Sequence, residues 1–271
     1  MNINKKNRAI GVFDSGIGGL TVLKEIIKEL PHESTIYLGD TARVPYGIRS
    51  PETVIRYSFE NTQFLSSKDI KLLVVACNTA SSISLDAIKN SISVPIVGVI
   101  EPGSKAAVRE TKNQKIGVIG TDTTIKSNSY TKAIKSIDNS IEVFGLACPL
   151  FVPLIEEGWT EGTIATLIAR QYLDRLKDKG IDTIVLGCTH YPLLKMVIAE
   201  VVGEGVSLID SAVETSYEIK TILTTLNLNT EQKGPPLREF YVTDSPERFL
   251  MVGENFLGHK IKHIEKIAVG N

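Results

Sequence analysis

In Val74-Val75-Ala76-Cys77-Asn78-Thr79, and again in Val185-Leu186-Gly187-Cys188-Thr189-His190, an apolar run ends on a cysteine that is followed by hydrogen-bonding side chains. Continuous apolar runs of this kind are typical of strands buried on both faces of a parallel sheet. Ligands bind beyond the carboxyl ends of such strands, so a cysteine at that point is well placed for chemistry. The two stretches predict an α/β fold in which matched strand ends each present a thiol.

Strand-like and helix-like segments alternate around these two stretches. Predicted strands cover residues 8–13, 35–38, 72–76, 96–100, 116–120, 141–146, 183–186, 206–209 and 240–243. Predicted helices cover residues 18–30, 50–68, 82–90, 127–137, 161–179, 212–226 and 246–256. Ser50 and Pro51 favour a helix start, because Ser caps a helix and Pro fits its first turn. The alternation predicts parallel sheets flanked by helices.

The second half of the chain repeats the first. Ile116-Gly117-Val118-Ile119-Gly120 lies 106 positions after the similar Ile10-Gly11-Val12-Phe13-Asp14, and Cys188 lies 111 positions after Cys77. One loop insertion accounts for the difference. We therefore predict two pseudo-symmetric domains, each with a mainly parallel sheet. Residues 1–99 with 213–271 form the first, because the tail is too short for a domain of its own, and residues 100–212 form the second.

The length and charge limit the kinds of partner. The chain has 271 residues, enough for two cores of ~100–150 residues each. Its formal net charge is −1 and no basic face stands out, so nucleic acid and anionic membranes are poor partners. No apolar run approaches the ~18 residues that cross a bilayer. We expect a cytoplasmic protein with free thiols, since three cysteines are too few for a disulfide framework.

Cys77 and Cys188 are the best candidates for acid/base chemistry. A cysteine at a strand end lies near the N-terminus of the next helix, which should lower the pKa of its thiol below ~8.5. Asn78 and Thr79 offer hydrogen-bond donors for a carboxylate, and His190 can set the protonation of Cys188. The alternative for each cysteine is a small buried hydrophobic residue.

Other motifs leave more than one interpretation open. Phe13-Asp14-Ser15-Gly16-Ile17-Gly18-Gly19 either aims backbone N–H groups at an anion or is a tight turn in which Asp14 caps a helix. A dinucleotide fingerprint fails, because Thr21 stands where the third glycine belongs. Residues 39–47 form a loop that contacts substrate or is a plain turn. The spacing of cysteines and histidines fits no zinc finger, and we expect no metal and a structural role for Cys148.

Taken together, the chain resembles the glutamate racemases of the cofactor-independent aspartate/glutamate racemase family. The resemblance covers nearly the whole chain and rests on six runs in the family's order. They are residues 13–20, 39–47, 76–81, 147–156, 186–193 and 209–212. No single run suffices, but six in order form a specific signature.

The resemblance implies interconversion of L- and D-glutamate without a cofactor, with the substrate at the interface of two α/β domains, to supply D-glutamate for peptidoglycan. It places the catalytic cysteines at Cys77, acting on the D-enantiomer, and Cys188, acting on the L-enantiomer. The implied substrate contacts are Asp14, Ser15, Tyr46, Gly47, Asn78, Thr79, Thr189 and His190, and His190 would also assist a cysteine. The implied auxiliary acids are Asp14, Asp40 and Glu156, with Glu157 as the alternative to Glu156.

Several alternatives remain open beside this resemblance. A related aspartate or hydantoin racemase, or a maleate isomerase, would use similar thiols. A two-lobed amino acid-binding protein would fit the fold but needs no thiol at both strand ends. The resemblance leaves room for a homodimer. Some members carry an N-terminal extension linked to activation by a cell-wall precursor, and the short stretch before Ile10 leads us to expect no such activation.

Overall fold

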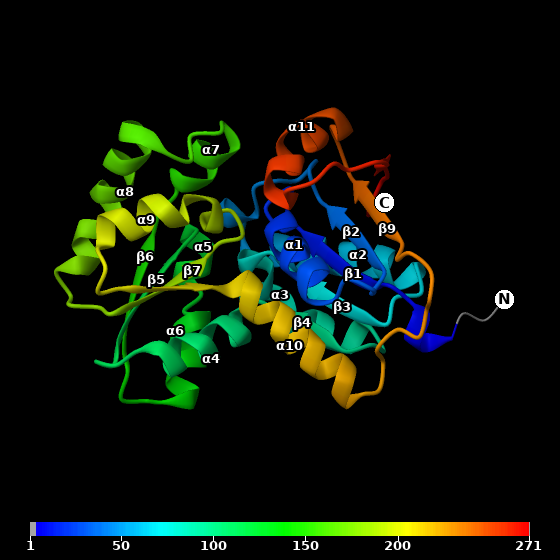
Figure 1. The fold of residues 1–271 in the computed structure, drawn as a ribbon, viewed down its shortest axis with the longest axis horizontal. Helices are drawn as coiled ribbons and strands as arrows, with labels where there is room; N and C mark the ends of the chain where they lie inside the picture. The colour runs from blue at the N-terminus through cyan, green and yellow to red at the C-terminus, as the bar shows by residue number, and fades with distance from the viewer. Residues whose placement is uncertain (1–3, 271) are drawn as a thin grey trace.

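Two parallel sheets with flanking helices make up the computed structural model, which describes residues 4–270 (Figure 1). The first sheet has six strands in the order β10-β9-β2-β1-β3-β4. They are β1 (Ile10–Asp14), β2 (Thr35–Gly39), β3 (Leu72–Val75), β4 (Ile96–Gly98), β9 (Arg238–Val242) and β10 (Glu265–Lys266). Neighbouring strands run parallel in both sheets, which confirms the predicted α/β class.

The second sheet repeats the central part of the first. Its four strands, in the order β6-β5-β7-β8, are β5 (Lys115–Gly120), β6 (Glu142–Ala147), β7 (Thr183–Gly187) and β8 (Ser207–Asp210). This order matches β2-β1-β3-β4 strand for strand. Gly11 of β1 pairs with Leu73 of β3, and Gly117 of β5 pairs with Ile184 of β7. The repeat inferred from the sequence is therefore present in the topology.

The helices lie between and around the strands. They are α1 (Leu20–Glu29), α2 (Pro51–Ser67), α3 (Asn78–Ile88), α4 (Ile100–Glu110), α5 (Asp122–Lys126), α6 (Ser129–Ile137), α7 (Phe151–Glu156), α8 (Gly162–Lys177), α9 (Lys195–Val202), α10 (Ser211–Thr225) and α11 (Pro246–Leu257). Short 3₁₀ helices cover Lys5–Asn7, Tyr46–Ile48, Lys89–Ser91 and Tyr191–Leu194. None of the helices in the described part of the chain is long and apolar enough to span a membrane.

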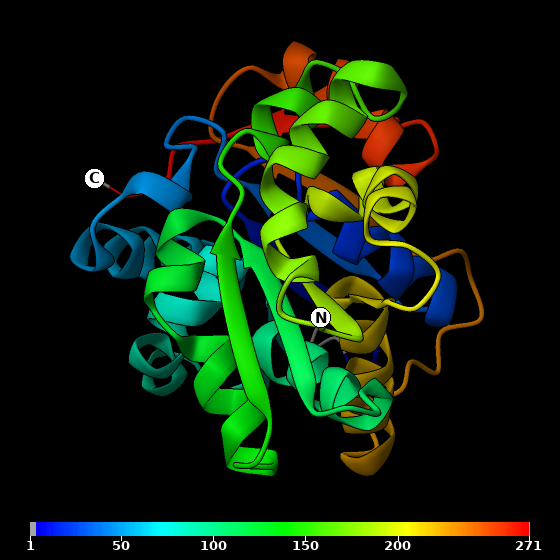
Figure 2. The same cartoon turned by 90° about the vertical axis from the view of Figure 1, so that its left-hand side faces the viewer.

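The central strands of each sheet are buried on both faces because their side chains alternate between two cores. In β7, Ile184 and Leu186 join the core that includes residues of α8 and α9, while Val185 joins the core that includes residues of α4 and α6. Figure 2 shows helices on either side of the second sheet. Double burial explains why these strands read as continuous apolar runs.

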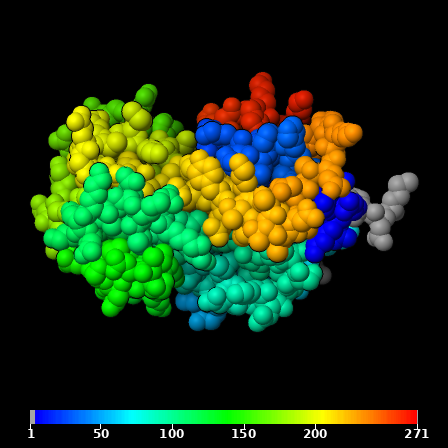
Figure 3. Space-filling view, turned by 60° about the horizontal axis from the view of Figure 1, so that its bottom comes forward, coloured from blue at the N-terminus to red at the C-terminus, as the bar shows by residue number. Residues whose placement is uncertain are grey.

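Helix α10 links the two halves of the molecule. It packs against α1 beside the first sheet and against α4 beside the second, and Figure 3 shows its surface crossing from one half to the other. Gly103 lets α4 approach closely, because a Cβ at that position would lie 3.2 Å from Cβ of Ser211. After α10 the chain returns to the first sheet as β9 and β10. The domain bounds, 1–99 with 213–271 and 100–212, remain a proposal.

Four helices, α4, α5, α7 and α9, were not predicted, and the predicted helix 127–137 corresponds to α6. Helix α4 contains Pro102 and Gly103, which usually break helices, but the proline lies in the first turn, where its missing N–H costs nothing. Helices α7 and α9 are too short to show a clear period. Asn128 separates α5 from α6, because it adopts the left-handed conformation with φ of 56°.

Candidate active site

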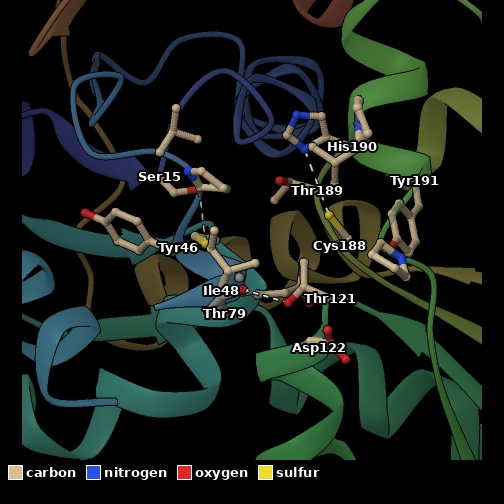
Figure 4. A pocket seen from close by; sticks show the side chains of 18 residues that line it. Ser15, Tyr46, Ile48, Thr79, Thr121, Asp122, Cys188, Thr189, His190 and Tyr191 are labelled. Carbon is tan, nitrogen blue, oxygen red and sulfur yellow. Dashed lines mark hydrogen bonds between the residues drawn. The ribbon is translucent and has the colours of Figure 1, made fainter. Parts of the chain in front are cut away.

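A cavity of about 150 Å³ is lined by residues that follow β3 in the first half and β7 in the second. Both Cys77 and Cys188 line it. The other lining residues are Ser15, Val44, Pro45, Tyr46, Gly47, Ile48, Asn78, Thr79, Thr121, Asp122, Pro149, Val152, Pro153, Thr189, His190 and Tyr191 (Figure 4). Drug-sized ligands occupy pockets of ~300–1,000 Å³, so this volume suits a small metabolite. The two thiols therefore share one small space between the halves.

Cys77 lies in an environment that disfavours charge. It precedes the first residue of α3, is 5% exposed, and its Sγ donates to the hydroxyl of Ser15 at 3.5 Å. Burial, and after it the negative charge of Asp14, raises the pKa of the Cys77 thiol to about 12. The prediction that the helix N-terminus lowers this pKa is wrong, because desolvation of a buried thiolate outweighs the helix dipole. Cys77 is therefore a thiol at neutral pH.

Cys188 belongs to a chain of three polar groups, called here the Cys188 relay, with His190 and Glu156. Cys188 Sγ lies 3.9 Å from His190 Nδ1, and His190 Nε2 lies 3.2 Å from Glu156 Oε1 (Figure 4 shows the first contact). Burial opposes charge on the imidazole, but the hydrogen bonds to Cys188 and Glu156 raise the pKa of His190 to about 10. The contact with His190 lowers the pKa of Glu156. His190 is thus a cation at neutral pH and stabilises negative charge on the Cys188 sulfur.

Asp14 lies behind the cavity wall and connects the two halves. Its carboxylate accepts the backbone N–H of Gly16 at 2.8 Å and the hydroxyl of Thr189 at 3.5 Å. Burial raises the pKa of Asp14, and the charge of His190 opposes that rise. The N-cap residue of α1 is Gly19, and hydrogen bonds from the backbone of Gly16 and Gly19 also oppose the rise in the pKa of Asp14. Asp14 therefore both closes the turn at Gly16 and bonds to the N-terminal end of α1.

Asp40 also lies behind the wall. Its carboxylate accepts hydrogen bonds from Arg43 Nε and from the hydroxyls of Tyr46 and Thr243. Tyr46 lines the cavity, and its hydroxyl also accepts the side-chain amide of Asn61 at 3.0 Å. Asp40 therefore supports Tyr46 from behind and does not itself line the cavity.

Asn78 brings an unpaired donor to the cavity. Its Oδ1 accepts the hydroxyl of Tyr130 at 2.7 Å, which fixes the orientation of the amide. Its Nδ2 is buried and has no hydrogen-bond partner among the described residues. A buried donor without a partner costs about 1–3 kcal/mol, which an oxygen of a bound ligand would offset. Asn78 is therefore poised to bind an acceptor such as a carboxylate.

Three threonine hydroxyls join the halves beside Asn78. Thr79 lies 3.0 Å from Thr121 and 3.3 Å from Thr124, which themselves lie 3.0 Å apart. Thr79 belongs to α3, whereas Thr121 and Thr124 follow β5, and Figure 4 shows Thr79 and Thr121 meeting. The hydroxyl of Thr123 donates to the carbonyl of Gly47 at 2.7 Å. The shape of the cavity thus depends on contacts between the halves.

The turn between β1 and α1 packs tightly on the loop that follows Cys188. A Cβ on Gly18 would lie 2.3 Å from Oγ1 of Thr189 and 2.5 Å from Nδ1 of His190. The hydroxyl of Thr21 donates to the backbone carbonyl of Thr189 at 2.8 Å. Gly18 is therefore required for the close approach of the two halves.

Cys148 does not join the other two cysteines. It is fully buried, its Sγ lies 3.8 Å from the carbonyl oxygen of Leu146, and it does not line the cavity. Burial raises the pKa of its thiol. Across residues 4–270 there is no group of three or more His, Cys, Asp or Glu side chains that could hold a metal ion.

Comparison with known proteins shows the family to which this chain belongs. The family model of the Asp/Glu/hydantoin racemases matches residues 10–215. The chain belongs to this family. A glutamate racemase of Geobacter metallireducens is 55% identical over 262 residues, 97% of each chain. The crystal structure of a glutamate racemase of Francisella tularensis subsp. tularensis in complex with D-glutamate is 40% identical, with a TM-score of 0.92 over 97% of this chain and 98% of that one. A glutamate racemase isoform of Bacillus anthracis is 43% identical, with a TM-score of 0.94 over the same shares.

The family assignment confirms the resemblance seen in the sequence, and the chain is an amino acid racemase, an isomerase. Nine of the predicted site residues of this racemase line the cavity: Cys77, Cys188, Ser15, Tyr46, Gly47, Asn78, Thr79, Thr189 and His190. The other three, Asp14, Asp40 and Glu156, lie behind the cavity wall. Thr121 was missed, although the offset of 106 from Gly11 to Gly117 also carries Ser15 onto Thr121. Tyr130 has no such signal, because only tertiary packing brings α6 to Asn78.

The arrangement can move a proton through the racemase cavity. A thiolate accepts a proton and a thiol donates one, so a two-base transfer must begin with unlike protonation of its two groups. Cys77 is held as a thiol, and the imidazolium of His190 lies beside Cys188. The two halves provide the same residue type at matched positions in opposite electrostatic settings.

Gly18→Ala should push the halves apart at the racemase cavity. The added methyl group must displace Thr189, His190 or its own turn, and overpacking of this kind costs ~1–3 kcal/mol. We expect a lower midpoint of denaturant unfolding and a loss of activity greater than the fraction unfolded. Gly205→Ala is the matched control, because a Cβ at Gly205 meets nothing within 4 Å. Wild-type stability and activity in Gly18→Ala would show that this contact does not set the approach.

Glu156→Gln should shift the alkaline side of the pH profile. Removing the carboxylate charge lowers the pKa of His190 from about 10, so the imidazolium is lost at lower pH. The basic limb of kcat/KM should move down by about one to three pH units, the usual effect of a neighbouring opposite charge. Glu157→Gln is the control, because Glu157 is the adjacent exposed carboxylate. An equal shift in both variants, or none in either, would contradict the Cys188 relay.

Proposed function

We propose that this racemase interconverts L- and D-glutamate by proton transfer between Cys77 and Cys188 without a cofactor. The observation that carries the proposal is that thiols from matched strand ends of the two halves line one cavity. Relatives that match nearly the full chain are named glutamate racemases, and one is solved with D-glutamate bound. The D-glutamate would be made in the cytoplasm and enter peptidoglycan synthesis.

The reaction starts from the protonation that the site favours. The α-proton of an amino acid is weakly acidic, so the site must supply both a base and stabilisation of the developing carbanion. The Cys188 thiolate, stabilised by His190, takes the proton from L-glutamate, and the Cys77 thiol delivers a proton to the opposite face. The D-product then leaves Cys77 as thiolate and Cys188 as thiol. The reverse reaction begins from that state.

The substrate carboxylate is bound mainly by neutral donors. Asn78 Nδ2 has no protein partner among residues 4–270, and the hydroxyls of Ser15, Thr79 and Thr189 line the same cavity. The N-terminus of α3 lies behind Cys77 and adds its positive end. Within the lining set, His190 is the residue whose side chain carries positive charge. Neutral donors hold a carboxylate without neutralising the Cys188 thiolate.

Two alternatives are separable by substrate and by chemistry. The family description includes aspartate and hydantoin racemases, which differ in the size of the substrate. An amino acid-binding protein with the same two-half architecture would bind without exchanging the α-proton. The high identity to glutamate racemases over nearly the full chain favours glutamate.

Incubation with L-glutamate in D₂O without added cofactor tests the reaction class. We expect loss of optical rotation, measured by polarimetry, together with incorporation of one deuterium at Cα of the D-product, measured by NMR. L-aspartate and a 5-substituted L-hydantoin are run in parallel. Faster turnover of either would overturn the choice of glutamate and leave the thiol chemistry standing, whereas binding of glutamate without deuterium uptake would overturn the proposed racemisation.

Cys77→Ala and Cys188→Ala should each remove one acid/base group. General acid or base catalysis contributes about 10²–10⁴-fold, so racemisation should fall by at least that factor in either variant. Circular dichroism should show an intact fold. Cys148→Ala is the matched control and should keep its activity, because Cys148 does not line the cavity. Substantial racemisation by either of the first two variants would contradict the two-thiol mechanism.

A further inference from the structure

An arginine from the other half of the molecule reaches the Cys188 relay. Nη2 of Arg248 on α11 lies 3.4 Å from Oε2 of Glu156 at the end of α7. Helix α11 follows β9 of the first sheet, and α7 follows β6 of the second. The two helices face each other across the boundary between the halves in Figure 1. The ion pair therefore crosses that boundary at the outer end of the relay.

The two oxygens of Glu156 have different partners. Oε1 bonds to His190 Nε2 at 3.2 Å, and Oε2 is held by Arg248. A carboxylate rotates easily about its last torsion, because that torsion has broad minima. A partner on each oxygen fixes the plane of the group and keeps Oε1 directed at the imidazole. The hydrogen bond from His190 and, to a lesser degree, the charge of Arg248 lower the pKa of Glu156.

Helix α11 also packs directly on the histidine. The ring of Phe256 stands edge-on to the ring of His190, with centroids 5.3 Å apart and an interplanar angle of 86°. Phe256 is buried, so it shields that side of the imidazole from water. One helix of the first half thus contacts both the carboxylate and the imidazole of a relay that belongs to the second half.

We propose that Arg248 is a positioning residue for the proposed racemisation. From the first half it holds the carboxylate of Glu156 on His190, and through His190 it supports the negative charge on Cys188. Arg248 does not line the cavity with the two thiols; it borders a separate depression with Ile17 and Phe249. Its side chain is 61% exposed, and an ion pair so exposed adds little stability, so its effect lies in orientation. The inference rests on the proposed function.

The charged and titratable groups around the relay set the sign of the expected effect. They are Glu156 at the end of α7 and Glu157 just after it, Glu247 and Arg248 on α11, and Asp14, Cys77 and Cys188 around the cavity. Glu156 is the group that raises the pKa of His190 from outside the cavity. Loosening Glu156 therefore lowers that pKa, and the imidazolium is lost at lower pH. The basic limb of the kcat/KM profile must move down.

Arg248→Met and Arg248→Lys test the proposal through the pH profile. Arg248→Met should lower kcat/KM about two- to fivefold and move the basic limb down by about half a pH unit, the size expected for one exposed ion pair. Arg248→Lys keeps the positive charge, so it should retain most of the wild-type kcat/KM and a basic limb close to the wild-type position. Lys262→Met removes an exposed cation beyond α11 and is the control for net charge. L- and D-glutamate have equal free energies, so the equilibrium constant is one and kcat/KM must change equally in both directions. Either enantiomer can therefore be used as the substrate in the assay.

A double-mutant cycle shows whether Arg248 acts through Glu156. In a Glu156→Gln background, adding Arg248→Met should change neither kcat/KM nor the basic limb further, because residues that act through one another are not additive. An equal loss in both backgrounds, without a pH shift, would mean that Arg248 attracts the anionic substrate and would overturn the proposal. A wild-type profile for Arg248→Met would overturn it too and leave the proposed function intact. A wild-type protein that does not racemise glutamate would overturn the proposed function and this inference with it.

Discussion

The carboxyl ends of two parallel sheets meet around one small space, and the rest of the site depends on that contact. Each half alone places one thiol at the end of one buried strand. The two come to one cavity because Gly18 leaves room for Thr189 and His190, and because threonine hydroxyls pair across the boundary between α3 and the segment after β5. A side chain at Gly18 would collide with the relay before the halves could close. The contacts that bring the two halves close together are therefore the same contacts that bring the two thiols to one cavity.

A nearly symmetric backbone carries an asymmetric distribution of charge. Cys77 and Cys188 follow equivalent strands, yet Cys77 is buried near the carboxylate of Asp14, while Cys188 has a cationic histidine two residues away. A symmetric pair of thiols would begin with equal protonation, which a proton transfer between two bases cannot use. In the proposed reaction, the difference between the two surroundings supplies the starting state. The repeated fold sets the positions of the two sulfur atoms. The surrounding residues that differ between the two halves set the electrostatic environment of each sulfur.

The largest departure from the repeat is the C-terminal segment. Within residues 4–270, the second sheet has no counterpart of the strands β9 and β10, which extend the edge of the first sheet, or of the helix α11. The same segment places Phe256 and Arg248 against the relay of the opposite half. An addition to one half thus contacts the group that makes the two halves electrostatically different. Movement of the halves relative to each other would alter the surroundings of His190 directly.

The amino-acid sequence by itself determined the fold class, the repeat and the two thiols, because doubly buried strands and strand-end cysteines leave local, periodic signals. It also pointed to Asn78, Thr79, Thr189 and His190, which follow those cysteines directly. It could not give the raised pKa of Cys77, since burial and the charge of Asp14 come from distant segments and outweigh the local helix N-terminus. Tyr130 behind Asn78, Glu156 on His190 and Arg248 on Glu156 are contacts between elements far apart in the chain. Only the tertiary structure decides such contacts, because nothing in the local pattern of a helix says which residue of another half it will meet.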